Sequence, residues 1–196
     1  MNAQVKEKTM RKYKIIAFFG PSAAGKDTLA KQVCSIYPFT THFIVSHTTR
    51  PPRGYEVDGV DYHFVSVEKF TDMVLNYELM EAANYNEWFY GTSYGELHED
   101  KVNVGVFNLE GMKCIMDDPK LEVLPIYVIA ADATRLRRSL NRDNGRGCEE
   151  ICRRFLADKK EFREIPFEYY TWQNEENGSN EAESLLKKWL LKDKLD

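Results

Sequence analysis

The chain has 196 residues, enough for one domain with a sizeable core, and its content of 43% hydrophobic and 30% charged residues is that of a globular protein. Its formal net charge of −4 gives no argument for binding nucleic acid or an anionic membrane. The charged N-terminus lacks the apolar centre of a signal peptide, and no apolar run approaches the roughly 18 residues of a membrane span. We therefore expect a cytoplasmic protein without an obligate protein partner, whose cysteines are reduced thiols: Cys34, Cys114, Cys148 and Cys152.

The first part of the chain alternates between strand and helix patterns. After a charged lead-in over residues 1–12, residues 13–20 form an apolar run ending in glycine, which is typical of a strand buried on both faces. Apolar residues then recur at helical spacing, so a helix is expected from about Lys26 to before Pro38. Residues 42–46 are expected to form a second, short strand.

The segment from about 46 to 95 breaks this alternation. Residues 48–66 are rich in proline and glycine and have the pattern of small antiparallel strands. Residues 67–80 have a helical pattern, with Phe70, Val74 and Leu75 on one side. We interpret the whole segment as an inserted subdomain.

The remaining elements resume the alternation of strands and helices. Residues 103–111 and 124–130 are expected to be buried strands, and a basic helical stretch follows over 132–162 with a break near 144–147. Residues 181–195 form an amphipathic helix. Apolar strands that alternate with helices predict an α/β fold with a parallel central sheet covered on both faces.

The link between the first strand and helix has the spacing of a phosphate-binding loop, namely Gly20, four residues, Gly25 and Lys26. Glycines let backbone N–H groups converge on phosphate oxygens, and the start of the helix adds a favourable partial charge. The next position normally supplies a hydroxyl that holds Mg2+. Here it is Asp27, so either Thr28 or a water held by Asp27 would have to serve.

Two segments downstream carry a more specific pattern. They read VSHTTRPPRGYEVDGVDYHFVSVEKF over 45–70 and ELMEAANYNEWFYGTSYGEL over 78–97. In content and order they resemble guanylate kinases, and the resemblance extends from about residue 13 to 165. It implies one domain over 1–196 with a P-loop three-layer fold, divided into a core (about 13–45, 96–134 and 158–196), a nucleoside-monophosphate-binding subdomain (about 46–95) and a helical lid (about 135–157).

The resemblance also assigns a site for GMP in the inserted subdomain. Arg50 and Arg53 would grip the phosphate with tyrosine hydroxyls beside them, because arginine forks suit bidentate phosphate binding. Glu81 would accept hydrogen bonds from the ring N–H and amino group of guanine, a pair of donors that adenine lacks. The alternatives are solvated loop arginines, core tyrosines and a surface glutamate. The implied GMP-binding residues are Ser46, Arg50, Arg53, Tyr62, Glu81, Tyr90, Thr92 and Asn108.

The basic stretch falls where the family carries its lid. Arg138 and Arg142 are one helical turn apart, and Arg146 lies in the expected break. Arg154 matches a family arginine in the next helix, and Arg153 is the alternative in its place. Two further alternatives stay open: only one of Arg142 and Arg146 is essential, or the stretch is a solvated basic face. With Lys26, the implied catalytic residues are Arg138, Arg142, Arg146 and Arg154.

The sequence departs from the family in two places. One is Asp27 in the phosphate loop; the other is residues 103–111, where Val106 and Asn108 take the places of two aspartates. One of those acids normally helps to organise Mg2+. We hypothesise that Asp27 compensates for the lost charge.

The resemblance implies a kinase that moves the γ-phosphoryl group of ATP to GMP or dGMP with Mg2+ as cofactor. The alternatives are a kinase for another nucleoside or deoxynucleoside monophosphate, and a catalytically weakened binding module. The implied ATP-binding residues are Gly20, Pro21, Ser22, Ala23, Ala24, Gly25, Lys26, Asp27 and Thr28, with Asp27 and Thr28 as candidate metal ligands.

Overall fold

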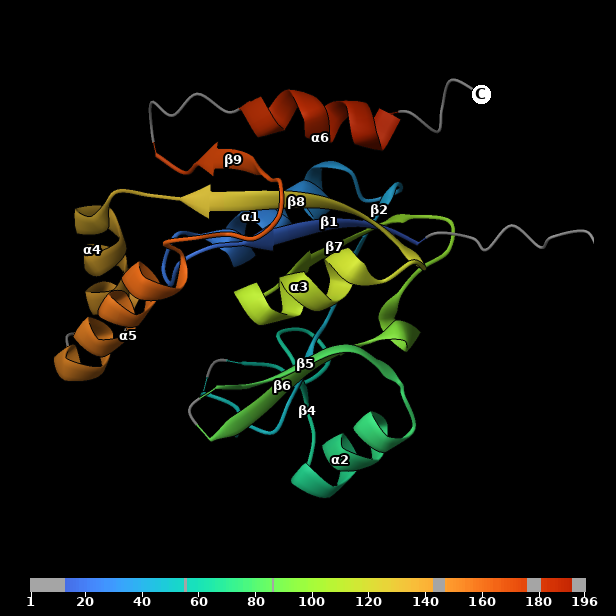
Figure 1. The fold of residues 1–196 in the computed structure, drawn as a ribbon, viewed down its shortest axis with the longest axis horizontal. Coiled ribbons are helices and arrows are strands. Elements are labelled where there is room, and N and C mark those ends of the chain that lie inside the picture. Colours follow the sequence, from blue (N-terminus) through green and yellow to red (C-terminus); the bar gives the residue numbers. More distant parts are fainter. Residues whose placement is uncertain (1–12, 55, 86, 143–146, 176–180, 192–196) are drawn as a thin grey trace, which may run out of the picture.

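A five-stranded parallel sheet forms the centre of the molecule (Figure 1). The structure is a computed structural model that describes residues 13–54, 56–85, 87–142, 147–175 and 181–191, so the expected lead-in over residues 1–12 lies outside it. The strand order is β2-β7-β1-β8-β9. The strands are β1 (Tyr13–Phe19), β2 (Thr41–Phe43), β7 (Val102–Val106), β8 (Leu121–Ile129) and β9 (Tyr170–Gln173).

Both faces of this sheet are buried, as the apolar strand β1 requires. Alternate residues of β1 enter two different cores: Phe18 joins the core beneath α1 (Lys26–Ile36) and α6 (Glu181–Leu191), whereas Phe19 joins the core beneath α3 (Leu109–Asp117). Successive side chains of a strand point to opposite faces, so a run without alternation fits only a sheet covered twice. The predicted three-layer α/β fold with a parallel central sheet is confirmed.

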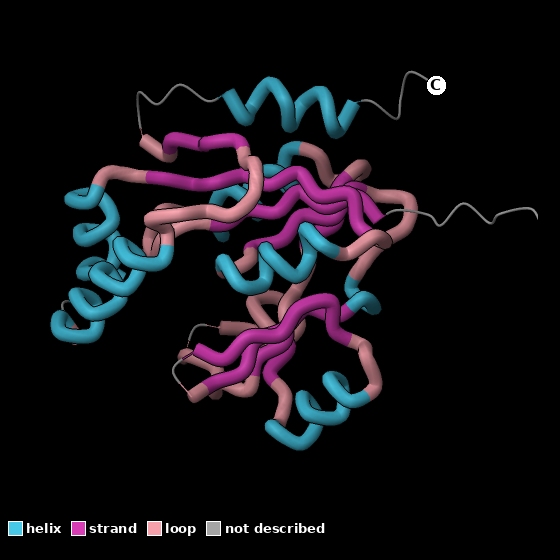
Figure 2. Tube along the Cα trace, in the orientation of Figure 1, coloured by secondary structure: helices cyan, strands magenta, loops and turns pink. Residues whose placement is uncertain are grey.

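A second, smaller sheet lies on the α3 side of the first (Figures 1 and 2). Its strand order is β4-β3-β6-β5. The expectation of antiparallel strands in residues 48–66 is wrong in one respect, because β3 and β4 pair in parallel. The elements are β3 (His47–Thr48), β4 (His63–Phe64), α2 (Val67–Leu75), β5 (Leu79–Tyr85), β6 (Trp88–Ser93) and the short 3-10 helix η1 (Tyr94–Glu96).

The predicted helix over 67–80 is shorter than expected, and of its predicted apolar side Phe70 is buried whereas Val74 and Leu75 are exposed. It ends at Leu75, which is 68% exposed, and the buried residues of α2 are Phe70 and Met73. Ser66 caps its start by accepting a hydrogen bond from the backbone N–H of Lys69. The chain then turns directly into β5, which begins at Leu79.

Two further helices, α4 (Asp132–Arg142) and α5 (Cys148–Glu161), stand at the end of the central sheet toward which the β8 arrow points (Figure 1). They correspond to the basic helical stretch, and the predicted break falls between them. In open parallel sheets, this carboxyl edge is where ligands bind. Among the described residues, no helix combines the length and apolar character needed to cross a bilayer.

Candidate functional site

The phosphate loop follows β1 and leads into α1, and its glycines are sterically required. Gly20 has φ +134°, and a Cβ there would lie 2.5 Å from the carbonyl oxygen of Val128. Gly25 has φ +98°, and a Cβ there would lie 2.2 Å from Nδ2 of Asn174. Both the left-handed backbone and the close neighbours exclude any larger residue. The loop therefore has the compact shape that lets backbone N–H groups converge on an anion.

Lys26 lies within this loop. Its Nζ donates a hydrogen bond of 3.0 Å to the carbonyl oxygen of Pro21. Burial lowers the pKa of Lys26, and the nearby carboxylates of Asp27 and Asp158 offset part of that effect. The ammonium group is thus held by one backbone acceptor at the place where a bound phosphate would supply stronger ones.

A buried ion pair, which the sequence analysis missed, fastens α4 and α5 to the loop. Asp158 Oδ2 accepts hydrogen bonds from the backbone N–H of Ser22 at 2.8 Å and from Arg135 Nη2 at 2.5 Å. Arg135 Nε donates in turn to the carbonyl oxygen of Ser22 at 2.9 Å. Arg135 is 5% exposed and Asp158 is 8% exposed. The two side chains hold both polar backbone groups of Ser22 at once.

Arg138 contacts the backbone carbonyl groups of the phosphate loop and of the segment after β9. Its Nη1 donates to the carbonyl oxygen of Ala24 at 3.1 Å, and its Nη2 donates to that of Asn174 at 3.2 Å. Asn174 Nδ2 donates to the same Ala24 oxygen at 2.7 Å. Arg138 and the segment after β9 therefore fix a carbonyl group of the phosphate loop.

A cavity of about 390 Å3 opens where the loop meets α4, α5 and the smaller sheet. Arginines from three segments line it. Arg53 belongs to the loop between β3 and β4, Arg135 and Arg142 belong to α4, and Arg154 belongs to α5. Arg153 is not among the lining residues, although Arg153 and Arg154 both pair with Glu150, at 2.6 Å and 2.7 Å from their Nε atoms. This geometry favours Arg154 over Arg153 as the residue facing the cavity. Arg146 lies outside the described residues.

The residues expected to hold the acceptor phosphate lie together. The guanidinium of Arg50 sits 5.6 Å from the ring centre of Tyr62, whose ring is 6.0 Å from that of Tyr90 in an edge-on arrangement. Burial raises the pKa of Tyr62, so its hydroxyl stays protonated and able to donate. The three side chains form one cluster on the smaller sheet.

Arg50 has a partner that the sequence analysis did not foresee. Its Nη1 and Nη2 donate to the two carboxylate oxygens of Glu56 at 2.9 Å and 2.8 Å. Glu56 also accepts from the backbone N–H of Arg53 at 2.7 Å. Burial of Glu56 would favour its neutral form, but the two arginines prevail and lower its pKa. Glu56 therefore orients the fork of Arg50.

Glu81 is buried beside a chain of hydroxyl groups. Thr92 Oγ1 donates to Glu81 Oε1 at 2.6 Å, and Ser46 Oγ lies 3.0 Å from Thr92 Oγ1. Burial raises the pKa of Glu81 to about 7, with the bond from Thr92 opposing the shift. A carboxylate has about four acceptor sites, so Glu81 can accept from an N–H donor in addition to Thr92.

The start of α3 completes this corner. Asn108 caps α3 by accepting a hydrogen bond from the backbone N–H of Gly111 at 2.7 Å. A Cβ at position 111 would lie 2.8 Å from Glu81 Oε2. Gly111 therefore lets the Glu81 carboxylate approach the central domain, and Asn108 stands at the same edge.

The candidate metal ligands lie in the first turn of α1. Asp27 and Thr28 are exposed, and they offer carboxylate and hydroxyl oxygens, which suit Mg2+. Apart from the group His47, His63 and Glu96, the described residues hold no set of three or more His, Cys, Asp or Glu ligands close together. Since Mg2+ commonly takes one or two protein oxygens together with substrate phosphates, the residues of the loop fit this ion.

A phosphate loop that joins a buried parallel strand to a helix, faced by an arginine-lined cavity, defines the class of P-loop proteins. The guanylate kinase family model matches residues 12–193, and the chain belongs to this family. It is 34% identical over 161 residues to guanylate kinase from Geobacter metallireducens, covering 80% of this chain and 78% of that one. It is 36% identical over 153 residues to guanylate kinase from Ruegeria sp., covering 75% of this chain and 70% of that one. The crystal structure of guanylate kinase from Anaplasma phagocytophilum shares the fold, with 21% identity, a TM-score of 0.58, and coverage of 95% of this chain and 88% of that one.

Proposed function

We propose that this protein is an ATP-dependent nucleoside monophosphate kinase that transfers the γ-phosphoryl group of ATP to GMP or dGMP, giving ADP and GDP or dGDP. The observation that carries the proposal is the arginine-lined cavity between the phosphate loop and the smaller sheet. Transfer between two anionic nucleotides needs positive charge around the moving group, and such a cavity supplies it. The names of the curated relatives support the choice of GMP.

On the donor side, residues 20–28 would cradle the phosphates of ATP. Lys26 would exchange the carbonyl oxygen of Pro21 for a terminal phosphate oxygen. Asp27 and Thr28 would hold Mg2+, which supplies charge neutralisation between the phosphates when it is bound. We assign the core to about 13–45, 96–134 and 158–196, and the lid to about 135–157.

On the acceptor side, the segment near 46–95 would bind the monophosphate. Arg50, Arg53, Tyr62 and Tyr90 would hold its phosphate, with Arg50 already oriented by a carboxylate. The clustering of these side chains supports that assignment.

The base of the acceptor would lie against Glu81, Ser46 and Thr92. Glu81 would accept from the ring N–H and amino group of guanine, while Thr92 keeps the carboxylate in place. Asn108 uses its Oδ1 atom to cap α3, so its contribution to the nucleotide would come from Nδ2. Adenine offers no matching pair of donors, which is the physical basis for selecting guanine.

The chemical step needs positioning more than acid–base catalysis. An ionised phosphate oxygen of GMP attacks the γ-phosphorus in line, and Lys26 and the lid arginines stabilise the charge on the transferred group. Arg142 and Arg154 line the cavity, whereas Arg138 supports the loop backbone. Closure of the lid over both substrates would exclude water.

The test is an ADP-release assay with ATP and a panel of nucleoside monophosphates. We expect rapid turnover with GMP or dGMP. A Lys26→Met variant should lose about 100-fold or more of kcat/KM, because it removes the positive charge that stabilises the transferred phosphoryl group. Strong turnover with a different acceptor, together with poor turnover with GMP, would favour a kinase for another nucleoside or deoxynucleoside monophosphate. Undetectable ATP binding at millimolar concentration would favour the binding module and overturn both kinase interpretations.

Asp27 is expected to serve Mg2+ in place of the acids missing at Val106 and Asn108. Asp27 lies close enough to the buried Lys26 and Tyr62 for its charge to influence the pKa of both. An Asp27→Ser variant should therefore require more Mg2+ and lose about tenfold of its turnover at fixed ATP, the effect of one charge-assisted contact. Thr28→Val is the matched variant, which removes the neighbouring hydroxyl instead. Full Mg2+-dependent turnover in Asp27→Ser would contradict the hypothesis that Asp27 compensates for the acids missing at Val106 and Asn108.

A further inference from the structure

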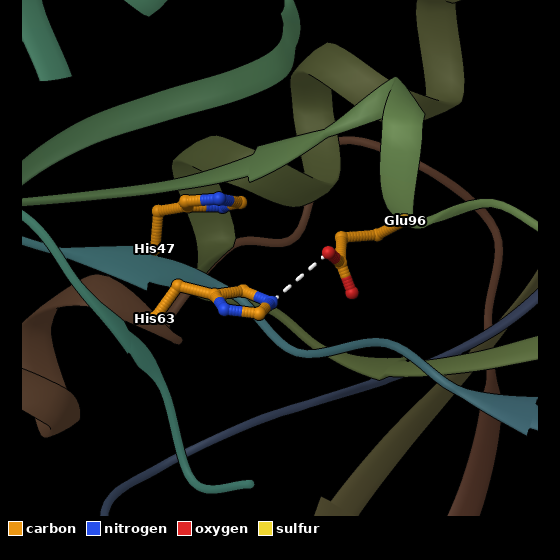
Figure 3. Close-up of side chains that lie close together, drawn as sticks. All are labelled: His47, His63 and Glu96. Carbon is orange, nitrogen blue, oxygen red and sulfur yellow. Dashed lines mark hydrogen bonds and ion pairs between the residues drawn. The ribbon is translucent and has the colours of Figure 1, made fainter. Parts of the chain in front are cut away.

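Three potential metal ligands from three separate elements meet on the smaller sheet (Figure 3). His47 belongs to β3, His63 belongs to β4, and Glu96 ends η1. One ligand atom from each residue lies within 4.8 Å of the others, and His63 Nε2 is 3.0 Å from Glu96 Oε1. The group is separate from the phosphate loop and from the arginine-lined cavity.

His47 is the unusual member of the group. Its ring lies 4.6 Å from that of His63, centre to centre, with an angle of 32° between the planes. Its Nδ1 atom is buried and has no hydrogen-bond partner among the residues that the structure describes. Leaving a buried polar atom unpaired costs free energy, so such an atom points to a partner that the unliganded protein does not supply. Burial and the neighbouring His63 lower the pKa of His47, which keeps the imidazole in the neutral form that binds metals.

The chemistry of the three ligands selects a class of ion. Two imidazoles and one carboxylate are a common ligand set for Zn2+ that leaves a fourth position for water. Mg2+ and Ca2+ prefer oxygen ligands throughout, so this set does not suit them. Zinc–ligand bonds of about 2.1 Å place tetrahedral ligand atoms about 3.4 Å apart. The ligand atoms lie within 4.8 Å of one another, so side-chain rotations that bring them to about 3.4 Å would complete the geometry.

We propose that His47, His63 and Glu96 form a binding site for one divalent transition-metal ion of the Zn2+ type. The ion replaces the pairing of His63 with Glu96 by two metal–ligand bonds and adds a third from His47. It thereby cross-links β3, β4 and η1, which lie far apart in the sequence. The proposal does not depend on the kinase activity, because the site uses none of the residues assigned to ATP or GMP.

The experiment is a calorimetric titration of the full chain with ZnCl2 in the absence of nucleotide and Mg2+. Double variants give matched proteins, because the chain has four histidines. His47→Gln with His63→Gln removes the two proposed ligands. His42→Gln with His98→Gln removes the other two, whose rings also lie near each other, 5.9 Å apart. Both proteins keep the same number of histidines and the same cysteines.

We expect one Zn2+ per chain in the wild type and in the His42/His98 variant, and a loss of affinity of about tenfold or more in the His47/His63 variant. Glu96→Gln should show the same loss, and it guards against misfolding of the double variant, as does circular dichroism of each protein. Co2+ should give the visible spectrum of a site with nitrogen and oxygen ligands. Equal binding by all variants, a thiolate-to-cobalt charge-transfer band, or no binding by the wild type would each overturn the site.

Discussion

Replacing Glu81 with glutamine is expected to remove most use of GMP and at the same time to stabilise the unliganded protein. Glutamine presents an amide that can accept one hydrogen bond from guanine but not two. The loss of a charge-assisted pair predicts a fall of about 100-fold or more in kcat/KM for GMP. ATP binding should change little, because Glu81 lies at the smaller sheet and away from the phosphate loop.

The stability effect follows from the burial of the carboxyl group. Its pKa rises from 4.5 to about 7 in the folded protein, so the folded state keeps a proton that the unfolded state releases. The free energy of unfolding therefore falls as the pH rises from about 4.5 to 7, by up to about 3 kcal/mol. Glutamine does not titrate, so the free energy of unfolding of Glu81→Gln should rise relative to that of the wild type as the pH increases across this interval.

Two measurements separate these effects. Chemical denaturation of both proteins from pH 4.5 to 8 measures the free energy of unfolding, and coupled assays measure kcat/KM for GMP and the affinity for ATP. Glu122→Gln is the matched control, because Glu122 is an exposed carboxylate on β8. A Glu81→Gln protein that still prefers GMP over AMP by the wild-type factor would refute the assignment of Glu81 to the base.

Replacing Asp158, which lies where the lid joins the core, with alanine is expected to be strongly destabilising. It leaves the buried Arg135 guanidinium with only the longer pair to the half-exposed Asp132 at 3.5 Å, and breaking a buried ion pair typically costs about 3–5 kcal/mol. It also removes the acceptor for the backbone N–H of Ser22 in the phosphate loop. We therefore expect both a lower melting temperature and weaker ATP binding.

A second substitution tests whether the ion pair is the cause. Arg135→Met in the Asp158→Ala background removes the orphaned charge, so it should restore much of the lost stability. Glu183→Ala is the control, because it breaks an exposed pair with Lys187 that is worth less than about 1 kcal/mol. If the free energy of unfolding of Asp158→Ala lies within about 1 kcal/mol of the wild-type value, the ion pair does not anchor the lid.

The features that were predictable from the sequence are those encoded locally. The spacing of Gly20, Gly25 and Lys26 defines the loop because its geometry depends only on neighbouring backbone. The apolar run of β1 indicates a strand buried twice, and the structure places its side chains in two cores. The helical patterns on either side of 144–147 likewise predict α4 and α5, while most of the predicted break lies outside the described residues.

The features that were missed depend on partners far along the chain. No local pattern joins Arg135 to Asp158, because the pairing exists only once two helices meet at the loop. The strand β9 is half-exposed and lacks an apolar run, so its pairing with β8 rather than its own sequence defines it. The end of α2 at Leu75 is likewise set by the start of β5, since tertiary pairing overrides helical propensity.

The grip of Arg135 and Asp158 on Ser22 has a mechanical consequence. Through Arg135 and Asp158, α4 and α5 are both tied to the backbone of one residue of the phosphate loop, Ser22. Any adjustment of that peptide on loading the donor nucleotide is therefore passed directly to α4 and α5, and with them to Arg142 and Arg154. On the proposed mechanism, we therefore expect binding of the donor nucleotide to be coupled to the orientation of these two arginines, so that their charge is placed when a phosphate is present.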